Sequence, residues 1–377
     1  MSKLIPRSGK TLNNSAMPEK LKDILFPREK VQLFADLLVA AYPQFEADKF
    51  IELVCNDKWP ERELKEKMRH TTQCLHQFLP DDFSLAVDIL KSIVAKVEGF
   101  EAIVLPDYVE VYGQEHWDIS LPALGELTKC GSSEFAIRPF LNKNLKKTME
   151  YMYEWAEDED YRVRRFASEG CRPRLPWGAG VPTLKKDPSP IIPILEKLKD
   201  DPELFVRKSV ANSLNDISKN HPELVLDLCK RWQGKSENTD WIIKQGCRSL
   251  LKQGNKQAML LFGFANPGKI HVENLKLSND SPAIGDEIIF SFDLKVENSM
   301  KQKVRLEYVV HYVKSSGKTS PKVFQISETV LKKGTHRIKK KHSFANMSTR
   351  KHYRGEHKIE VVVNGEVKAE AKFNLLP

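Results

Sequence analysis

The sequence predicts a protein of two parts: an all-α solenoid of HEAT-like helical repeats, followed by an all-β sandwich of the immunoglobulin type. Three observations support this fold class. From about residue 30 to 265, apolar residues recur at three- and four-residue intervals, which is the spacing of amphipathic helices. From about residue 120 these segments resemble one another at offsets of 35 to 43 residues, as stacked helix pairs do. After residue 268 the apolar period changes to two, which indicates strands.

The composition of the chain is that of a globular protein. Its 377 residues are 41% hydrophobic and 29% charged, which allows two or more domains with a large buried core. No apolar run approaches the roughly 20 residues that cross a bilayer, and the N-terminus lacks the apolar segment of a secretory signal. The cysteines are widely spaced and the histidines form no metal-ligand pattern. We therefore expect a cytoplasmic monomer in a reducing compartment, with no metal, no cofactor and no membrane partner.

The helical part is expected to span residues 21–265, after a flexible basic tail at 1–20 that has no apolar period. The first helices are predicted within 27–45, 63–80 and 83–100, where apolar residues follow the helical spacing. Proline or glycine punctuates these segments, and both residues disfavour continuation of a helix.

The later helices repeat one another in sequence. SSEFAIRPFL (132–141) and ASEGCRPRL (167–175) both contain Ser-Glu followed by Arg-Pro, about 35 residues apart. DEDYRVRRFASEG (158–170) aligns with DPELFVRKSVANS (201–213) at an offset of 43, and WIIKQGCRSL (241–250) repeats the pattern once more. Degenerate repeats of this length predict stacked helix pairs of the HEAT kind.

The β part is expected to span residues 269–377, with the boundary at Asn266-Pro267-Gly268. An apolar residue recurs at every second position of DEIIFSFDLKVE (286–297), from Ile288 to Val296, and of KVRLEYVVHYV (303–313), from Val304 to Tyr312. Near the end, Asn364-Gly365 lies between two alternating runs and suits the two-residue type I′ turn of a hairpin. About seven such strands in roughly 108 residues favour an immunoglobulin-like sandwich.

The net charge of +9 lies in the β part. From Lys269 to the end there are 21 Lys and Arg against 12 Asp and Glu, so the preceding residues carry 39 groups of each sign. A neutral body with a basic C-terminal domain indicates a polyanionic partner, with nucleic acid as the first candidate. A lysine-rich β surface with no such partner fits the composition equally well.

Acidic side chains recur on the outward faces of the repeat helices. In 161–170 the apolar residues take the core face and leave Glu169 outward, and Glu134 holds the matching position of the preceding repeat. In 204–217 the same reasoning leaves Asp216 outward. Because stacked repeats align their outward residues along one concave wall, these three carboxylates are predicted to converge there.

A simpler interpretation stays open at this point. Arg165 and Glu169 are spaced i, i+4 and can form a surface ion pair worth roughly 0.3 to 0.5 kcal/mol, with no function. Trp177, which follows a helix end, can equally be a plug of the core.

At these residues the chain resembles a known family. SSEFAIRPFL, RRFASEGCRPRLPWG, VRKSVANSLNDISKNHPELV and the FGF before the β part resemble the AlkC branch of the HEAT-repeat DNA alkylation repair glycosylases. The resemblance covers residues 20–265, and one branch of that family carries an immunoglobulin-like domain. It implies that the catalytic acidic residues are Glu134, Glu169 and Asp216 and that Trp177 is the aromatic residue beside the lesion.

The resemblance also implies an activity: a monofunctional alkylbase DNA glycosylase that hydrolyses the N-glycosidic bond of N3-methyladenine in duplex DNA, with N3-methylcytosine as a second substrate. An N3-methylated base is already cationic and leaves as a neutral base, so a general acid is not required. Carboxylates suit the rest of the reaction, because they stabilise an oxocarbenium-like sugar and can position water. An indole face adds about 0.5 to 2 kcal/mol of attraction to a cationic base.

The partner implied is double-stranded alkylated DNA, held through its phosphates without sequence preference. The basic residues expected to contact it are Arg138, Arg164, Arg165, Arg172, Arg174, Arg207, Lys208, Lys244, Lys339, Lys340 and Lys341. The alternative function is a HEAT-repeat scaffold or nucleic-acid-binding protein without catalysis. Release of a methylated base from duplex DNA discriminates between the two.

Overall fold

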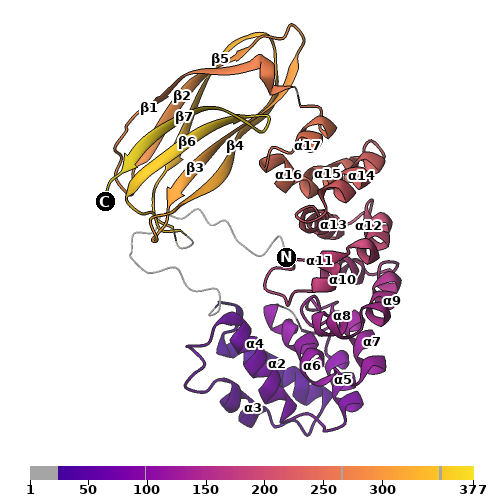
Figure 1. Ribbon diagram of the computed structural model, residues 1–377. Coiled ribbons are helices and arrows are strands. Elements are labelled where there is room, and N and C mark those ends of the chain that lie inside the picture. The colour runs from indigo at the N-terminus through magenta and orange to yellow at the C-terminus, as the bar shows by residue number, and fades with distance from the viewer. Residues whose placement is uncertain (1–23, 98, 265, 348–349) are drawn as a thin grey trace. The chain divides into compact units, whose positions relative to one another are not determined.

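The computed structural model describes residues 24–97, 99–264, 266–347 and 350–377 (Figure 1). The tail predicted at 1–20 lies outside the described residues. By its internal contacts the chain divides into two compact units: the residues up to Leu184 with Ser189–Ile194, and Lys185–Pro188 with Leu195–Pro377. This division falls within the helical part, not at the change from helix to strand, and each unit is considered by itself below.

The first unit is built of helices whose apolar faces pack on one another. Capping side chains mark where several begin: Asp82 accepts a hydrogen bond from the backbone of Leu85, and Glu63 and Glu66 form a capping box. α2 packs against α3, α4 against α6, and α9 against α10. The helices are α2 (Arg28–Ala41), α3 (Ala47–Val54), α4 (Leu64–His76), α5 (Phe83–Ser92), η1 (Phe100–Ile103), α6 (Val104–Tyr112), α7 (Trp117–Leu127), α8 (Arg138–Lys143), α9 (Leu145–Trp155), α10 (Tyr161–Gly170) and η2 (Ser189–Ile191).

The helices predicted over 27–45 and 63–80 are present as α2 and α4, whereas the one predicted over 83–100 ends at Ser92 and gives way to turns before η1. Two short helices, α11 (Pro182–Lys186) and α12 (Ile192–Leu198), contain points where the two units divide.

The helices of the second unit continue the repeat pattern. α13 packs against α15 with α14 between them in sequence, and the apolar face of α13, formed by Val206, Val210, Leu214 and Ile217, is buried. Ser236 caps α15 through a capping box with Thr239. The helices of this unit are α13 (Leu204–Ile217), α14 (Pro222–Trp232), α15 (Glu237–Gly246), α16 (Arg248–Lys252) and α17 (Lys256–Leu261).

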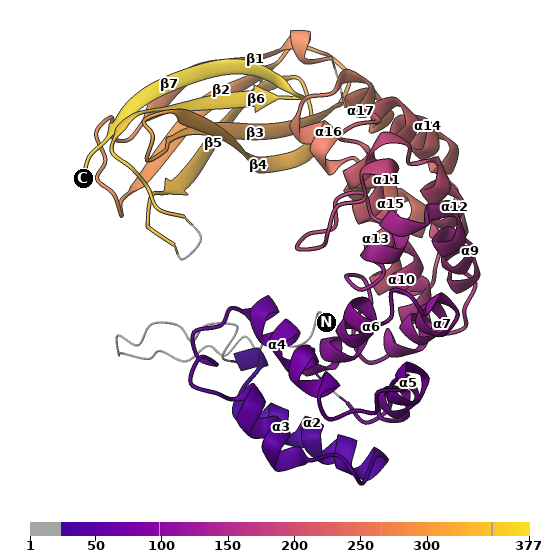
Figure 2. The ribbon, with the colours of Figure 1, turned by 60° about the horizontal axis from the view of Figure 1, so that its bottom comes forward.

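The β part of the second unit is a sandwich of two antiparallel sheets (Figure 2), as the sequence predicts. One sheet has the order β1-β2-β5 and the other β4-β3-β6-β7. The alternating residues of β2, from Ile288 to Val296, fill the space between the sheets and are buried. The elements are η3 (Pro267–Lys269), β1 (Ile270–Leu277), β2 (Glu287–Val296), β3 (Gln302–Val313), β4 (Thr319–Leu331), β5 (Gly334–Ser343), β6 (Gly355–Val363) and β7 (Glu366–Leu375).

The predicted hairpin turn also contacts the last helices. Asn364 and Gly365 both have positive φ, 47° and 82°, as a type I′ turn requires. A Cβ on Gly365 would come within 2.4 Å of Cα of Gly254, which lies between α16 and α17, so the two backbones touch. Close by in the same unit, Lys303 Nζ of β3 donates a hydrogen bond to the carbonyl of Phe262 over 2.9 Å. The sandwich is therefore packed directly on the end of the helical repeats.

Candidate functional site

Glu169 lies in the last turn of α10. The helix begins at the capping residue Asp160, and its core face, including Val163 and Phe166, is fully buried, which fixes the direction of the remaining side chains. Glu169 is 5% exposed. A carboxylate at this end of a helix faces the negative pole of the helix dipole, so it requires compensating cations.

Two arginines supply that compensation. Arg172 Nη1 donates to Oε1 of Glu169 over 2.5 Å, and Arg165 Nη2 lies 3.5 Å from the same oxygen. Arg165 Nη1 also donates to Oε2 of Glu134 over 2.5 Å, and Ser132 Oγ donates to that oxygen over 2.7 Å. Arg165 therefore bridges Glu134 and Glu169 in a largely buried network, in place of a simple solvent-exposed i, i+4 pair.

Glu134 is not on a helix. It lies in the turn over residues 133–137 that leads into α8, whereas its sequence counterpart Glu169 is in a helix end. The turn is anchored by Ser133, whose Oγ donates to the carbonyl of Leu124 at the end of α7 over 2.8 Å. The expectation that both residues occupy equivalent helix positions is therefore wrong, although Arg165 brings their carboxylates together.

Arg138 holds the loop that follows α10. The residue is fully buried, its Nε donates to the carbonyl of Ala179, and its Nη1 donates to the carbonyls of Gly170 and Arg172, each over 2.7 Å. A side chain with no exposed surface cannot reach a phosphate, so the predicted DNA contact of Arg138 is replaced by a structural role. Asn142 adds a bond to the carbonyl of Gly180 over 3.0 Å.

This loop presents Trp177 to solvent. The side chain is 67% exposed, so it is not a plug of the core. Its φ of 63° lies in the left-handed region, which costs a residue other than glycine about 1 kcal/mol or more. Lys65 Nζ of α4 donates to the carbonyl of Trp177 over 2.8 Å and helps to hold this conformation. An exposed indole on a strained backbone is a feature that packing alone does not require.

Asp216 belongs to the second unit. It lies in the last turn of α13, is 3% exposed, and is 3.4 Å from Lys219 Nζ. The pair Asp216–Lys219 repeats the i, i+3 arrangement of Glu169–Arg172, again with a carboxylate at a helix end. Because Glu134 and Glu169 belong to the other unit, the convergence of all three carboxylates stays a prediction.

Two of the predicted DNA-contacting arginines have matching structural contacts. Arg164 Nη1 donates to the carbonyls of Asp158 and Glu159, and Arg207 Nη1 donates to those of Asp201 and Pro202. Each arginine thus fastens the loop before its own helix, at equivalent points of two repeats. Both side chains are half-buried, so part of each guanidinium is committed to the protein.

The remaining predicted contacts are lysines and one arginine on accessible surface. Arg174 and Lys208 are exposed. Lys244 pairs with Glu328 of β4 over 2.9 Å, and Lys341 pairs with Glu287 of β2. On β5, Lys339 is exposed and Lys340 is half-buried, because successive residues of a strand face opposite sides.

The structure of the Pseudomonas fluorescens alkylpurine DNA glycosylase AlkC, bound to DNA containing an abasic site analogue, matches with a TM-score of 0.90 and 36% identity, over 95% of this chain and 100% of that one. The chain belongs to the AlkC family. The DNA alkylation repair enzyme profile matches residues 131–250, the segment that contains all three candidate carboxylates.

Two further matches agree with AlkC family membership. The profile described as the C-terminal Ig-like domain of the uncharacterised protein YhaZ matches residues 271–377, and therefore the sandwich. The uncharacterised protein YhaZ of Bacillus subtilis is 43% identical over 356 residues, which is 94% of this chain and 99% of that protein. The similarity to both relatives thus extends over the helical repeats and the sandwich of this chain.

The cysteine that follows α10 is fully buried. Burial raises the pKa of the Cys171 thiol, which follows α10, to about 12, so this thiol is neutral near pH 7 and is not a ready nucleophile. Within the described ranges, no group of three or more His, Cys, Asp or Glu side chains is arranged to hold a metal ion, and no helix is long and apolar enough to cross a membrane. In the first unit, the candidate residues thus comprise the carboxylates of Glu134 and Glu169, the arginines that pair with them, and the exposed indole of Trp177.

Proposed function

We propose that this protein is a monofunctional DNA glycosylase that hydrolyses the N-glycosidic bond of N3-methyladenine in double-stranded DNA, with N3-methylcytosine as a second substrate. The observation that carries the proposal is the pairing of Glu134 and Glu169 through Arg165, in the same unit as the solvent-exposed indole of Trp177. The AlkC relative, named as an alkylpurine DNA glycosylase, supports the same reaction class.

The proposed chemistry assigns electrostatic work to the carboxylates. The methylated base departs as a neutral molecule, so positive charge moves to the sugar as the bond breaks. Anions close to that sugar stabilise the oxocarbenium-like transition state, and one carboxylate can accept a proton from the attacking water. We assign these roles to Glu134 and Glu169 together, with Asp216 as the third acidic group.

Trp177 is proposed to contact the cationic base. A quadrupole-bearing indole face attracts a cation more strongly than a neutral base, so the contact favours the lesion over normal bases by about 0.5 to 2 kcal/mol. Because the indole is exposed before any ligand arrives, the contact needs no rearrangement of the protein core.

The arginines of the network reduce the repulsion between the carboxylates and the phosphates of DNA. Carboxylates next to a DNA backbone repel its phosphates, and Arg165 and Arg172 offset that repulsion in the free protein by pairing with Glu134 and Glu169. The basic sandwich is proposed to add further phosphate contacts through Lys339, Lys340 and Lys341. Such contacts give affinity without sequence preference, which suits a search for damage.

The experiment that tests the proposal is base release from methylated duplex DNA. Wild-type protein should release N3-methyladenine, and Glu169→Gln and Glu134→Gln should each reduce the single-turnover rate about a hundredfold or more, the usual effect of losing one electrostatic contact to a transition state. Glu154→Gln, at an exposed carboxylate on α9, is the control and should leave the rate unchanged.

Two further readouts separate the alternatives. Binding of methylated duplex without release of any base by wild-type protein would assign the chain to non-catalytic DNA binders. Sedimentation of the complex should give one protein per duplex, as expected for a monomer.

A further inference from the structure

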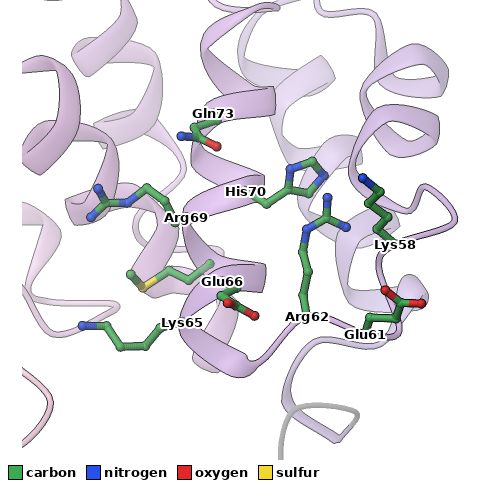
Figure 3. Close-up of a pocket in the computed structure, with 9 residues that line it drawn as sticks. Lys58, Glu61, Arg62, Lys65, Glu66, Arg69, His70 and Gln73 are labelled. Carbon is green, nitrogen blue, oxygen red and sulfur yellow. The ribbon is translucent and has the colours of Figure 1, made fainter.

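A charged hollow crosses α4 in the first unit and has no role in the proposed chemistry. It is open to solvent, has a volume of about 760 Å³ and is lined by four cations and two carboxylates: Lys58, Arg62, Lys65, Arg69, Glu61 and Glu66. Figure 3 shows Lys65 and Arg69 extending to one side of α4, while Lys58 and Arg62 lie on the other side with His70. The hollow therefore spans the width of the helix.

The cations in this hollow differ in what they contact. Arg69 is neutralised, because it binds Asp107 through two hydrogen bonds of 3.0 and 2.8 Å and Glu110 through a third of 2.8 Å. Arg62 instead donates to the neutral side chain of Asn56 over 2.9 Å. Lys65 donates to the backbone carbonyl of Trp177.

The other three cations of the hollow differ from Arg69 in this respect. Within the part of the chain that the structure describes, Lys58, Arg62 and Lys65 form no ion pair. Of the two carboxylates, Glu66 is engaged in the capping box, where it accepts a hydrogen bond from the backbone N–H of Glu63 over 2.7 Å. Burial lowers the pKa of His70, and the positive charge of Arg62 lowers this pKa further.

The chemistry of the lining favours a polyanion over a small apolar ligand. Ligand pockets of this size are mostly lined by apolar and aromatic side chains, whereas Met68 is the one apolar residue among those that line this hollow. A guanidinium and two ammonium groups spread across a helix match phosphates that follow one another along a strand. Lys65 connects the hollow to the loop that carries Trp177.

We infer that this hollow binds the phosphodiester backbone of DNA beside the base that Trp177 contacts. The inference rests on the proposed function for the identity of the ligand as DNA, and adds an anchoring site on α4 and the turn before it. Lys58 and Arg62 each contact a phosphate, and Lys65 is shared between a phosphate and the carbonyl of Trp177.

The test uses the full chain and a duplex containing an abasic-site analogue, with binding measured by fluorescence anisotropy between 50 and 200 mM salt. Each lost phosphate contact lowers the slope of log K against log salt by about 0.9. The double variant Lys58→Ala/Arg62→Ala should therefore lose about 1.8 from the slope, and its binding defect should shrink about tenfold over this salt range.

Two control variants show whether a change in slope comes from the loss of the charges of Lys58 and Arg62. Lys143→Ala/Lys147→Ala removes two cations of the same unit that are already paired, with Glu115 and Asp118, and should keep the wild-type slope. Lys58→Arg/Arg62→Lys keeps both charges and should also keep it. Equal slopes for wild type and Lys58→Ala/Arg62→Ala would overturn the inference. That result is distinct from failure of the proposed function, in which wild-type protein releases no base.

Discussion

Arg138→Lys distinguishes a structural role of this residue from a contact with DNA. Lysine keeps the positive charge but replaces a planar fork by a single ammonium group, which cannot reproduce the three bonds to Gly170, Arg172 and Ala179. If two of these are lost at about 1.5 kcal/mol each, the loop over 171–181 is destabilised by about 3 kcal/mol. Its open fraction then rises about a hundredfold.

The assay is hydrogen exchange of the loop amides, read together with base release. The amide of Gly178, which donates to the carbonyl of Leu175 over 3.2 Å, should exchange much faster in the Arg138→Lys variant, and base release should fall because Trp177 is no longer held in place. Arg162→Lys, at an exposed arginine paired with Asp160, is the control. Unchanged exchange and unchanged base release in Arg138→Lys would refute the assigned role.

Three further predictions concern the sandwich, the indole and the lysine beside it. Burial, followed by the positive charges of His352, Arg350 and Lys322, lowers the pKa of His342 to about 4, so the unfolded chain binds a proton more readily below pH 6.5. The sandwich should be fully stable above that pH and lose about 2 kcal/mol between pH 7 and 5. Pulse proteolysis in urea would measure this loss, and an equal loss in His342→Gln would contradict the assignment. Trp177→Ala should leave the urea midpoint unchanged, because the indole is 67% exposed, yet reduce base release about 2- to 30-fold, as a contact of about 0.5 to 2 kcal/mol requires; Trp177→Phe should retain part of the rate. Borohydride should trap no covalent complex with abasic DNA, even though Lys65 lies beside Trp177; a trapped complex that disappears in Lys65→Arg would show lyase chemistry instead.

Local patterns in the sequence predict most of the architecture, because they reflect periodic burial. The apolar spacing of 27–45 and 63–80 appears as α2 and α4, and the alternation from Ile288 to Val296 becomes the inner face of a sheet. Asn364-Gly365 adopts the predicted turn, because a type I′ turn needs positive φ at both positions and these residues tolerate it.

Local sequence patterns do not predict the contacts within the candidate site, because the residues that form these contacts are far apart in the chain. Arg138 looks like an outward repeat residue, yet its partners are 32 to 41 residues away and enclose it completely. Lys65 and Trp177 are 112 positions apart. The link from Arg165 to Glu134 spans 31 positions and depends on a turn that replaces the expected helix.

The repeated arginines of α10 and α13 show how a sequence repeat can be misinterpreted without the structure. Arg164 and Arg207 occupy equivalent repeat positions, and each fastens the loop that precedes its own helix. Repetition can thus record a structural requirement of every repeat as readily as a binding surface.

The contact between Gly254 and Gly365 bears on how this protein can be dissected. Residues 266–268 separate helix from strand and are an obvious place to truncate the chain. A truncation there would remove the backbone contact of Gly365 with Gly254 and the hydrogen bond from Lys303 to Phe262, so α16 and α17 would lose the residues that cover them. A truncated chain that fails to bind DNA would then report damage to the remaining helices as much as the loss of a module. Charge substitutions on β5 leave the contact between the sandwich and the last helices intact, and they are therefore a better test of what the sandwich contributes to DNA binding.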